Sequence, residues 1–457
     1  MPNEKRNKVR LLTALMLLSV PLAACGTGSV SNSGEKSQTP SVSANKDWTK
    51  ESFKVVFFAN NTQKQEEIDF WFGNPLRKKF PNIEFVWQPS TPGYTLPELV
   101  ATGGQIDVFF TTRGNFETLA YGHDIQYDMT ELAKLHDVDL SRIEPILLDE
   151  VKRTSGGKLY MLPVQNNIQL LFYNKDIFDK FGVTYPKDGM TWDEVLALGS
   201  KMTRKDGDKL YFGFSNQGAG QVIKMNPMSL VKVDPETGKV QVNKDPKWAS
   251  LFETFFVRPY PPNAVFQEFF AKNSAPPGIL QFYKEQNTAM TTYIASLLGQ
   301  QYMDLYLGDL NWDIVSHPTI SGYPGLGTQP DPIYIGMTKL TKNKEATMEV
   351  IKYLVSDEYQ TMMARQANMT VLKDPAIQKQ TGADIQRSGV GKNWGALYAN
   401  KMAPLAPIHP KVDLLVVTEL SKYANQVSKG ELDLNTALRT AEEVIQKKID
   451  EELAKGK

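Results

Sequence analysis

The chain of 457 residues contains a single cysteine, Cys25. It follows Leu22-Ala23-Ala24 at the end of an apolar run that begins at Leu11, and four basic residues stand ahead of that run. A basic head, an apolar stretch and small residues before a cleavage point are typical of a secretory signal, and the run is shorter than the ~20 residues that span a bilayer. Because a thiolate is a strong nucleophile, we expect residues 1–24 to be removed and Cys25 to carry lipid, including palmitate.

The segment after this cysteine is polar. Residues 25–47 contain many Ser, Gly and Thr residues and few apolar ones, which predicts a flexible linker behind a lipid anchor. No second cysteine is available for a disulfide, so the stability of an extracytoplasmic protein must come from its hydrophobic core. The remaining length is enough for two domains or lobes.

The charge composition argues against nucleic acid as a partner. The whole chain has 51 Lys and Arg residues and 51 Asp and Glu residues. The leader holds four basic residues and one acidic residue, so the part after it carries a formal net charge of −3. Because the sequence has no basic stripe, we expect no nucleic-acid partner, and contact with the membrane only through the N-terminal lipid.

Known motifs of catalysis and metal binding are missing from the sequence. It has no Gly-x-Ser-x-Gly elbow, and its four histidines lie far apart without a His-Glu-x-x-His spacing. A glycoside hydrolase needs two carboxylates that face each other across a cleft, and no spacing singles out such a pair. Asp107 ends a buried stretch and is expected to cap its loop. We therefore predict no catalytic residue, no metal and no cofactor, with a secreted glycoside hydrolase as the less favoured alternative.

Strand-like and helix-like segments alternate along the chain. Strands are predicted over 53–59, 83–87, 106–110, 157–163, 165–173, 287–292 and 312–316, and helices over 65–80, 96–102, 174–181, 191–203, 245–256, 342–356 and 358–366, with two more between 412 and 453. The alternation favours a mostly parallel sheet with helices on both faces. Thr191 and Glu194 have the spacing of a capping box, and Trp71, Trp87 and Trp248 are predicted to be core residues.

Several motifs occur in an ordered series between Leu162 and Thr203. They are Pro163, Tyr173-Asn174-Lys175, Gly182 and Thr191-Trp192-Asp193-Glu194. Three further segments fit the same series, namely Ile106-Asp107-Val108, Thr288-Ala289-Met290 and the helix start from Thr341 to Ala346. The order resembles the extracellular solute-binding proteins of ABC importers, and among them the sugar-type, maltodextrin-binding-protein-like family 1.

This resemblance implies an α/β, two-lobed periplasmic-binding-protein-like fold. Mostly parallel sheets would be flanked by helices, with a ligand cleft between the lobes, and the lobes would rotate to close on the ligand. We expect the chain to cross between lobes near 162–164, 314–318 and 369–375. Lobe one would then hold residues 48–162 and 317–370, and lobe two residues 163–315 and 375–457.

The resemblance also implies a function. The chain would be a monomeric lipoprotein on the bacterial cell surface that captures a carbohydrate, most of all an oligosaccharide. It would deliver this ligand to the transmembrane permease subunits of an ABC transporter without chemical turnover. Binding of another polar solute, such as a peptide, stays open as an alternative.

Amide, hydroxyl and aromatic side chains suit a ligand with hydroxyl groups and C–H faces. The candidate ligand-binding residues are Asn60, Asn61, Thr62, Thr112, Arg113, Gln165, Asn167, Gln217, Tyr293 and Tyr323. Helix capping by Asn60 and Asn61, edge hydrogen bonds in 165–167 and core packing of Tyr293 are structural alternatives. Because amides dominate this set and its only charge is Arg113, we expect a neutral ligand rather than an anion.

The sequence departs from the family pattern at two positions. Thr111 stands where many maltodextrin binders have an aromatic ring, and Tyr293 to Ser296 replace a Trp-containing run. A maltose-like stacking platform is therefore not expected at Thr111.

Overall fold

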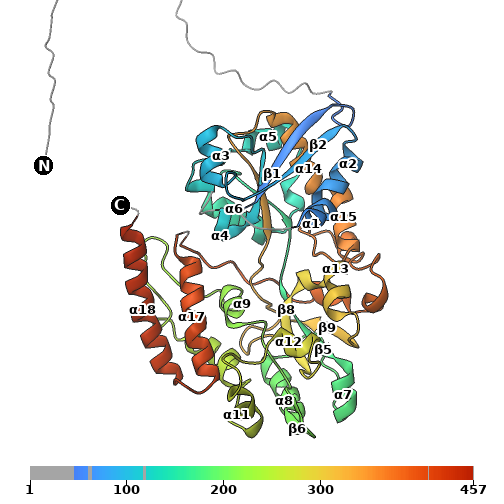
Figure 1. Ribbon diagram of the computed structural model, residues 1–457. Helices are drawn as coiled ribbons and strands as arrows, with labels where there is room; N and C mark the ends of the chain where they lie inside the picture. The colour runs from blue at the N-terminus through green and yellow to red at the C-terminus, as the bar shows by residue number, and fades with distance from the viewer. Residues whose placement is uncertain (1–45, 60–63, 117–119, 410, 456–457) are drawn as a thin grey trace, which may run out of the picture. The chain divides into compact units, whose positions relative to one another are not determined.

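The computed structural model describes residues 46–59, 64–116, 120–409 and 411–455. Two sheets form the centres of two lobes (Figure 1). The strands of lobe one are β1 (Phe53–Ala59), β2 (Ile83–Pro89), β3 (Val108–Thr112), β4 (Leu162–Gln165) and β10 (Ile333–Met337), and those of lobe two are β5 (Gln169–Asn174), β8 (Met290–Ile294) and β9 (Trp312–Ser316). Their orders are β2-β1-β3-β10-β4 and β8-β5-β9. A separate hairpin joins β6 (Arg204–Asp206) and β7 (Lys209–Tyr211).

Helices cover both sheets. Those that pack in the core of lobe one are α1 (Gln65–Ile68), α2 (Asn74–Lys79), α3 (Leu96–Thr102), α4 (Arg113–Phe116), α5 (Thr130–Leu135), α6 (Pro145–Thr154), α14 (Lys344–Leu354), α15 (Asp357–Arg365) and α16 (Pro375–Gln378). Lobe two contains α7 (Lys175–Phe181), α8 (Trp192–Met202), α9 (Ala219–Lys224), α10 (Lys247–Phe252), α11 (Ala264–Phe270), α12 (Ile279–Tyr283), α13 (Gln300–Tyr302), α17 (Asp413–Ser428) and α18 (Leu434–Ala454). Within the described ranges, no helix has the length and apolar character to cross a membrane.

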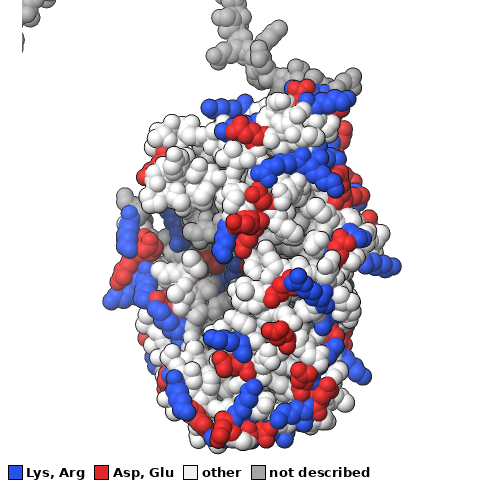
Figure 2. Space-filling model, turned by 45° about the vertical axis from the view of Figure 1, so that its right-hand side comes forward, with Lys and Arg blue, Asp and Glu red and all other residues white. Residues whose placement is uncertain are grey.

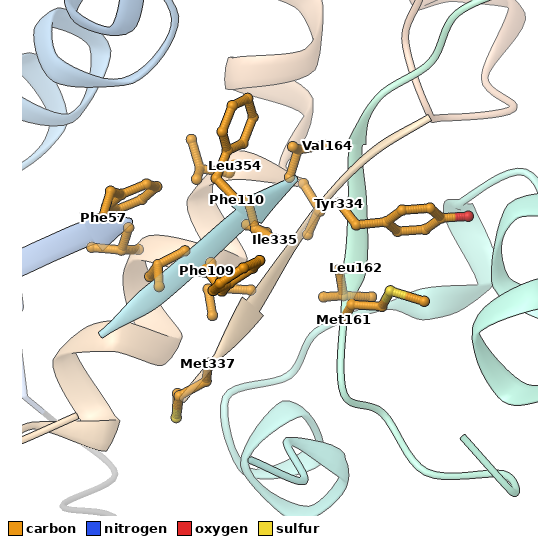
Figure 3. Packing of buried hydrophobic residues seen from close by; sticks show 14 of the residues in the cluster. Phe57, Phe109, Phe110, Met161, Leu162, Val164, Tyr334, Ile335, Met337 and Leu354 are labelled. Atoms are coloured by element: carbon orange, nitrogen blue, oxygen red, sulfur yellow. The ribbon is translucent and has the colours of Figure 1, made fainter. Parts of the chain in front are cut away.

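The sheet of lobe one has a parallel centre. Strand β1 pairs in parallel with both β2 and β3, and β10 runs antiparallel between β3 and β4. Phe57, Phe109 and Ile335 pack with other apolar side chains of this core (Figure 3). Helices on both faces bury six of the seven residues of β1, which explains why its sequence is a continuous apolar run. The predicted α/β class is confirmed.

The sheet of lobe two differs from the expected parallel arrangement. Strand β5 pairs antiparallel with both β8 and β9, while Phe212 and Ser215 add parallel bridges to Thr288 and Thr291. Alternate side chains of β5 enter two separate cores, with Leu170 and Phe172 in one and Leu171 and Tyr173 in the other, because successive side chains of a strand point to opposite faces.

Several borders of helices and strands agree with those predicted from local sequence signals. The strands 53–59 and 312–316 and the helix 96–102 have the predicted bounds, Thr191 and Glu194 form the predicted capping box, and all three tryptophans assigned to the core are buried. The strand predicted over 157–163 begins only at Leu162. Its predicted first residue, Gly157, belongs to a turn in which Gly156 and Gly157 have left-handed φ angles of 63° and 88°.

The residue borders predicted for the two lobes remain a prediction. By sheet pairing, β4 still belongs to lobe one as far as Gln165. Thr319 bridges to Thr191, and Ile320 and Tyr323 pack against the core of lobe two. These contacts would move the first two crossings to about 166–168 and about 328–332.

Asp107 is a structural residue of lobe one. The carboxylate is buried, at 1% exposure, and accepts hydrogen bonds from Val56 N at 2.7 Å, Gln105 Nε2 at 2.7 Å and Thr341 Oγ1 at 2.6 Å. It therefore ties β1 to the loop before α14, in agreement with the capping role that the sequence suggested.

We predict that Asp107→Ala lowers the free energy of unfolding by roughly 3 kcal/mol, because it leaves several buried donors without a charged acceptor. Glu84→Ala is a matched control in the same sheet, since Glu84 forms an exposed ion pair with Lys54 and such pairs contribute roughly 0–1 kcal/mol. Urea denaturation measures both variants. Equal stabilities of the two variants would contradict this role.

His136 is buried in lobe one between two carboxylates of α14. Its ring nitrogens lie 2.6 Å from Glu349 Oε1 and 3.0 Å from Glu345 Oε2 on α14. Burial alone lowers the pKa of His136, but the hydrogen bond to Glu349 and the charges of Glu349 and Glu345 outweigh it and raise the pKa above 6.5. The group thus binds its proton more tightly in the folded state than in the unfolded chain.

For a raised pKa, the stabilisation is fully present below the unfolded value and is lost as the pH rises through the folded value. We predict that His136→Gln lowers the free energy of unfolding more at about pH 6 than at about pH 9. Denaturant titrations of wild type and variant at both pH values measure this difference. A pH-independent difference would show that the imidazolium has no such role.

Candidate ligand-binding site

A cavity of about 350 Å³ lies where segments of both lobes meet. Lobe one contributes the junction of β3 and α4, lobe two contributes the ends of α9 and α17, and two connecting segments complete the wall. Its described lining residues are Thr112, Arg113, Gly114, Asn115, Lys224, Lys232, Gln329, Pro330, Asp331, Pro332, Leu405, Ala406, Ile408, Lys411, Asp413, Leu414 and Val417. Figure 2 shows a hollow in the surface with both basic and acidic side chains at its border.

Arg113 fixes the lobe-one side of this cavity. It directly follows β3, is buried, and donates from Nη2 to the Ala406 carbonyl oxygen at 2.8 Å. Its Nη1 lies 3.0 Å from Glu150 Oε1. Glu150 also accepts two hydrogen bonds from Arg153, at 3.0 and 2.6 Å, so one carboxylate serves two guanidinium groups.

Gln329 holds the connecting segments together. It is buried, donates from Nε2 to the Asn226 carbonyl oxygen at 2.9 Å, and accepts from Ala406 N at 2.6 Å. Nearby, Asp331 N donates to the Asn167 carbonyl oxygen at 2.8 Å. The Gln329 side chain therefore satisfies two backbone groups that have no strand partner here, as buried polar groups require.

Lysine side chains form the charged part of the wall. Lys224 Nζ lies 2.6 Å from Asp331, and Lys232 Nζ lies 3.0 Å from Asp413, with only 4% of the Lys232 side chain exposed. Burial lowers the pKa of Lys232; the charge of Asp413 opposes this, and the charges of Arg113 and Lys224 add to it. Lys411 is exposed and has no ion-pair partner among the described residues.

None of these three lysines was predicted from the sequence. They come from separate stretches of the chain, and no local motif marks any of them. Arg113 was expected to be the only cation near the cleft, whereas the turn after α9 and the segment before α17 bring Lys232 and Lys411 to the same cavity. The described lining contains no aromatic side chain.

Two of the predicted ligand-binding residues, Thr112 and Arg113, line the cavity. Three predicted amides have a polar partner inside the protein. Gln165 Nε2 donates to Asn368 Oδ1 at 2.8 Å, Asn167 Oδ1 accepts from Ser296 N at 3.1 Å, and Gln217 Oε1 accepts from Ile294 N at 3.0 Å. They position the strands and loops around the junction of the lobes.

The remaining candidates lie elsewhere or outside the described residues. Tyr293 and Tyr323 are half-buried and pack against cores of lobe two. Asn60, Asn61, Thr62 and Cys25 lie outside the described residues. In the described ranges, no group of three or more His, Cys, Asp or Glu side chains is placed to hold a metal ion.

Comparison with known proteins gives a consistent result. The arabinooligosaccharide-binding protein of Bacillus subtilis (strain 168) is 24% identical over 260 residues, which are 53% of this chain and 52% of that protein. The chain thus matches about half the length of this relative.

Solved structures share the fold over most of the chain. A sugar transporter from Rhizobium etli in an open conformation has a TM-score of 0.68 at 17% identity, covering 86% of this chain and 99% of that one. An ABC substrate-binding protein from Listeria monocytogenes in complex with cycloalternan has a TM-score of 0.65 at 18% identity, covering 88% and 100%. Both comparisons establish a two-lobed periplasmic-binding-protein fold.

The family comparison covers every strand of the two sheets except β1. Residues 61–361 match the family described as bacterial extracellular solute-binding protein. This match extends over more than half of the sequence and includes the β3–α4 junction, α9 and the segment 329–332. The chain belongs to the bacterial extracellular solute-binding protein family.

Proposed function

We propose that this protein captures a carbohydrate, most of all an oligosaccharide, and delivers it to the permease subunits of an ABC transporter. The observation that carries the proposal is the cavity between two lobes, which has polar and charged side chains from both of them. A ligand bound there contacts both lobes at once, as a binding protein of this fold requires. Membership in an extracellular family indicates a location outside the cytoplasm.

The names of similar proteins support a saccharide as the ligand. The relative from Bacillus subtilis is an arabinooligosaccharide-binding protein, and the Listeria protein is described in complex with cycloalternan. Their low identity to this chain leaves the identity of its own ligand open. A peptide or another polar solute is the alternative ligand class.

The carboxylates around the cavity favour binding over hydrolysis. Asp331 and Asp413 are each paired with a lysine, and Glu150 is shared between two arginines. A glycosidase needs one carboxyl group that donates a proton and one carboxylate that acts as nucleophile or base. Because each of these carboxylates is already paired with a cation inside the protein, we propose that the protein is not an enzyme.

We propose Thr112 and Arg113 as ligand contacts from lobe one. For Asn60, Asn61 and Thr62, and for Gln165, Asn167, Gln217, Tyr293 and Tyr323, ligand contact stays a prediction. The three described amides use one polar atom inside the protein and retain a second one.

We predict that a cognate oligosaccharide raises the melting temperature and is recovered intact. A ligand at a hundredfold excess over its Kd stabilises the folded state by about 2.7 kcal/mol. A thermal-shift screen over oligosaccharides, followed by calorimetry and chromatography of the recovered saccharide, measures binding and turnover together. Shortened products would support a hydrolase, and stabilisation only by peptides would support the alternative ligand class.

A matched pair of variants locates the binding site in the same measurement. Leu414 lines the cavity and is 75% exposed, whereas Leu305 is 68% exposed and does not line it. We expect Leu414→Asn to weaken binding by roughly three- to tenfold, and Leu305→Asn to leave the affinity unchanged.

We also propose that the protein is a monomer anchored by lipid on Cys25. Cys25→Ser is expected to abolish incorporation of labelled palmitate and to release the protein from the membrane fraction, because this serine lacks the thiolate that forms the thioether. Metabolic labelling and fractionation in a bacterial host measure both effects. Wild-type protein without label, or a variant that stays in the membrane fraction, would contradict the anchor.

A further inference from the structure

The cavity carries an excess of positive charge that the rest of the chain does not share. Four cations line it, namely Arg113, Lys224, Lys232 and Lys411. The first three each face one carboxylate, of Glu150, Asp331 and Asp413 respectively. The chain after the leader has a formal net charge of −3. The positive charge at the cavity is therefore a local property of the fold, because the chain after the leader is not basic overall.

The partners of these cations leave binding capacity unused. An ammonium group has three donors, and one carboxylate faces Lys232. Glu150 is divided between two guanidinium groups. Lys411 lines the cavity, is exposed, and has no ion-pair partner in the described ranges.

Burial of clustered cations is energetically unfavourable unless an additional anion is present. Lys232 is almost fully buried, and the neighbouring charges of Arg113 and Lys224 oppose its protonation. Grouped cations in a partly desolvated site repel each other and lose hydration. An anionic ligand would reduce both costs, as charge complementarity does in other binding sites.

The other lining residues argue in the same direction. They include Pro330, Pro332, Leu405 and Ile408, but no aromatic ring in the described part of the wall. Stacking of a sugar face on a ring, which gives neutral saccharides much of their binding energy, is therefore not provided here. Charge-assisted hydrogen bonds from Lys and Arg are the strong interactions that this wall offers.

We propose that the cavity recognises an acidic saccharide, whose anionic group is held among Arg113, Lys224, Lys232 and Lys411. The inference rests on the proposed carbohydrate-binding function and specifies its substrate class. The anion is a carboxylate, as in a uronic acid, or a sulfate ester, and both offer oxygen acceptors to the same cations.

Calorimetry with matched saccharides tests this proposal. The probes are a trigalacturonide, its methyl ester, a sulfated trisaccharide and a neutral trisaccharide. The methyl ester keeps the shape of the acid and removes its charge. We expect one of the two acidic probes to bind at least about tenfold more tightly than the uncharged probes, with an affinity that falls as salt rises from about 50 to about 500 mM.

Two lysine variants supply the control. Lys411 and Lys447 are both exposed, and only Lys411 lines the cavity. Lys411→Gln should weaken binding of the acidic probe by roughly three- to tenfold and leave any binding of neutral probes unchanged. Lys447→Gln, on α18, should leave both unchanged.

The outcomes distinguish a failure of the acidic-ligand inference from a failure of the proposed carbohydrate-binding function. Preference for the carboxylate or for the sulfate supports the inference and identifies the anion. Equal or tighter binding of the methyl ester or the neutral trisaccharide overturns the acidic ligand and leaves the carbohydrate function standing. If a wider screen of neutral and acidic saccharides finds no binding at all, the proposed function fails, and the inference fails with it.

Discussion

The junction of the two lobes depends on how buried backbone groups are satisfied where no strand pairing is available. Gln329 meets this requirement with one amide, which bonds to Ala406 N and to the Asn226 carbonyl oxygen. Arg113 bonds to the carbonyl oxygen of the same Ala406. The backbone N–H of Ala406 therefore bonds to Gln329, and its carbonyl oxygen bonds to Arg113. These bonds fix the position of the segment that forms this part of the cavity wall.

The ionic groups around the cavity follow from this geometry. The guanidinium of Arg113 is buried where it bonds to Ala406, and Glu150 pairs with it and with Arg153. Lys232 is buried against Asp413 at the first residue of α17. Buried ion pairs of this kind add little to stability relative to apolar packing. Their placement at the junction, and not in the cores of the lobes, agrees with a role in recognising a ligand.

Much of the fold could be predicted because its signals are local. The apolar run of β1, the capping box of α8 and strand β9, which begins with a tryptophan, can each be recognised from about a dozen neighbouring residues. The antiparallel pairing of β5 with β8 and β9 could not be read in this way, since partners more than 100 residues apart set it.

The site was harder to predict for the same reason. Thr112 and Arg113 follow a recognisable strand, whereas Lys232 and Lys411 have no motif and meet only in the folded chain. Side chains that look available in the sequence, such as Asn167 and Gln217, turned out to have partners in the protein.

Hydrogen exchange with and without a bound oligosaccharide tests the placement of the ligand most directly. Amide exchange is slowed where a ligand contacts and stabilises the backbone. A ligand in the cavity between the lobes should slow exchange in peptides that cover 112–116, 224–232 and 405–417, with little change in the distant hairpin of β6 and β7. Protection confined to other segments, with these three unchanged, would contradict a binding site at the junction of the lobes.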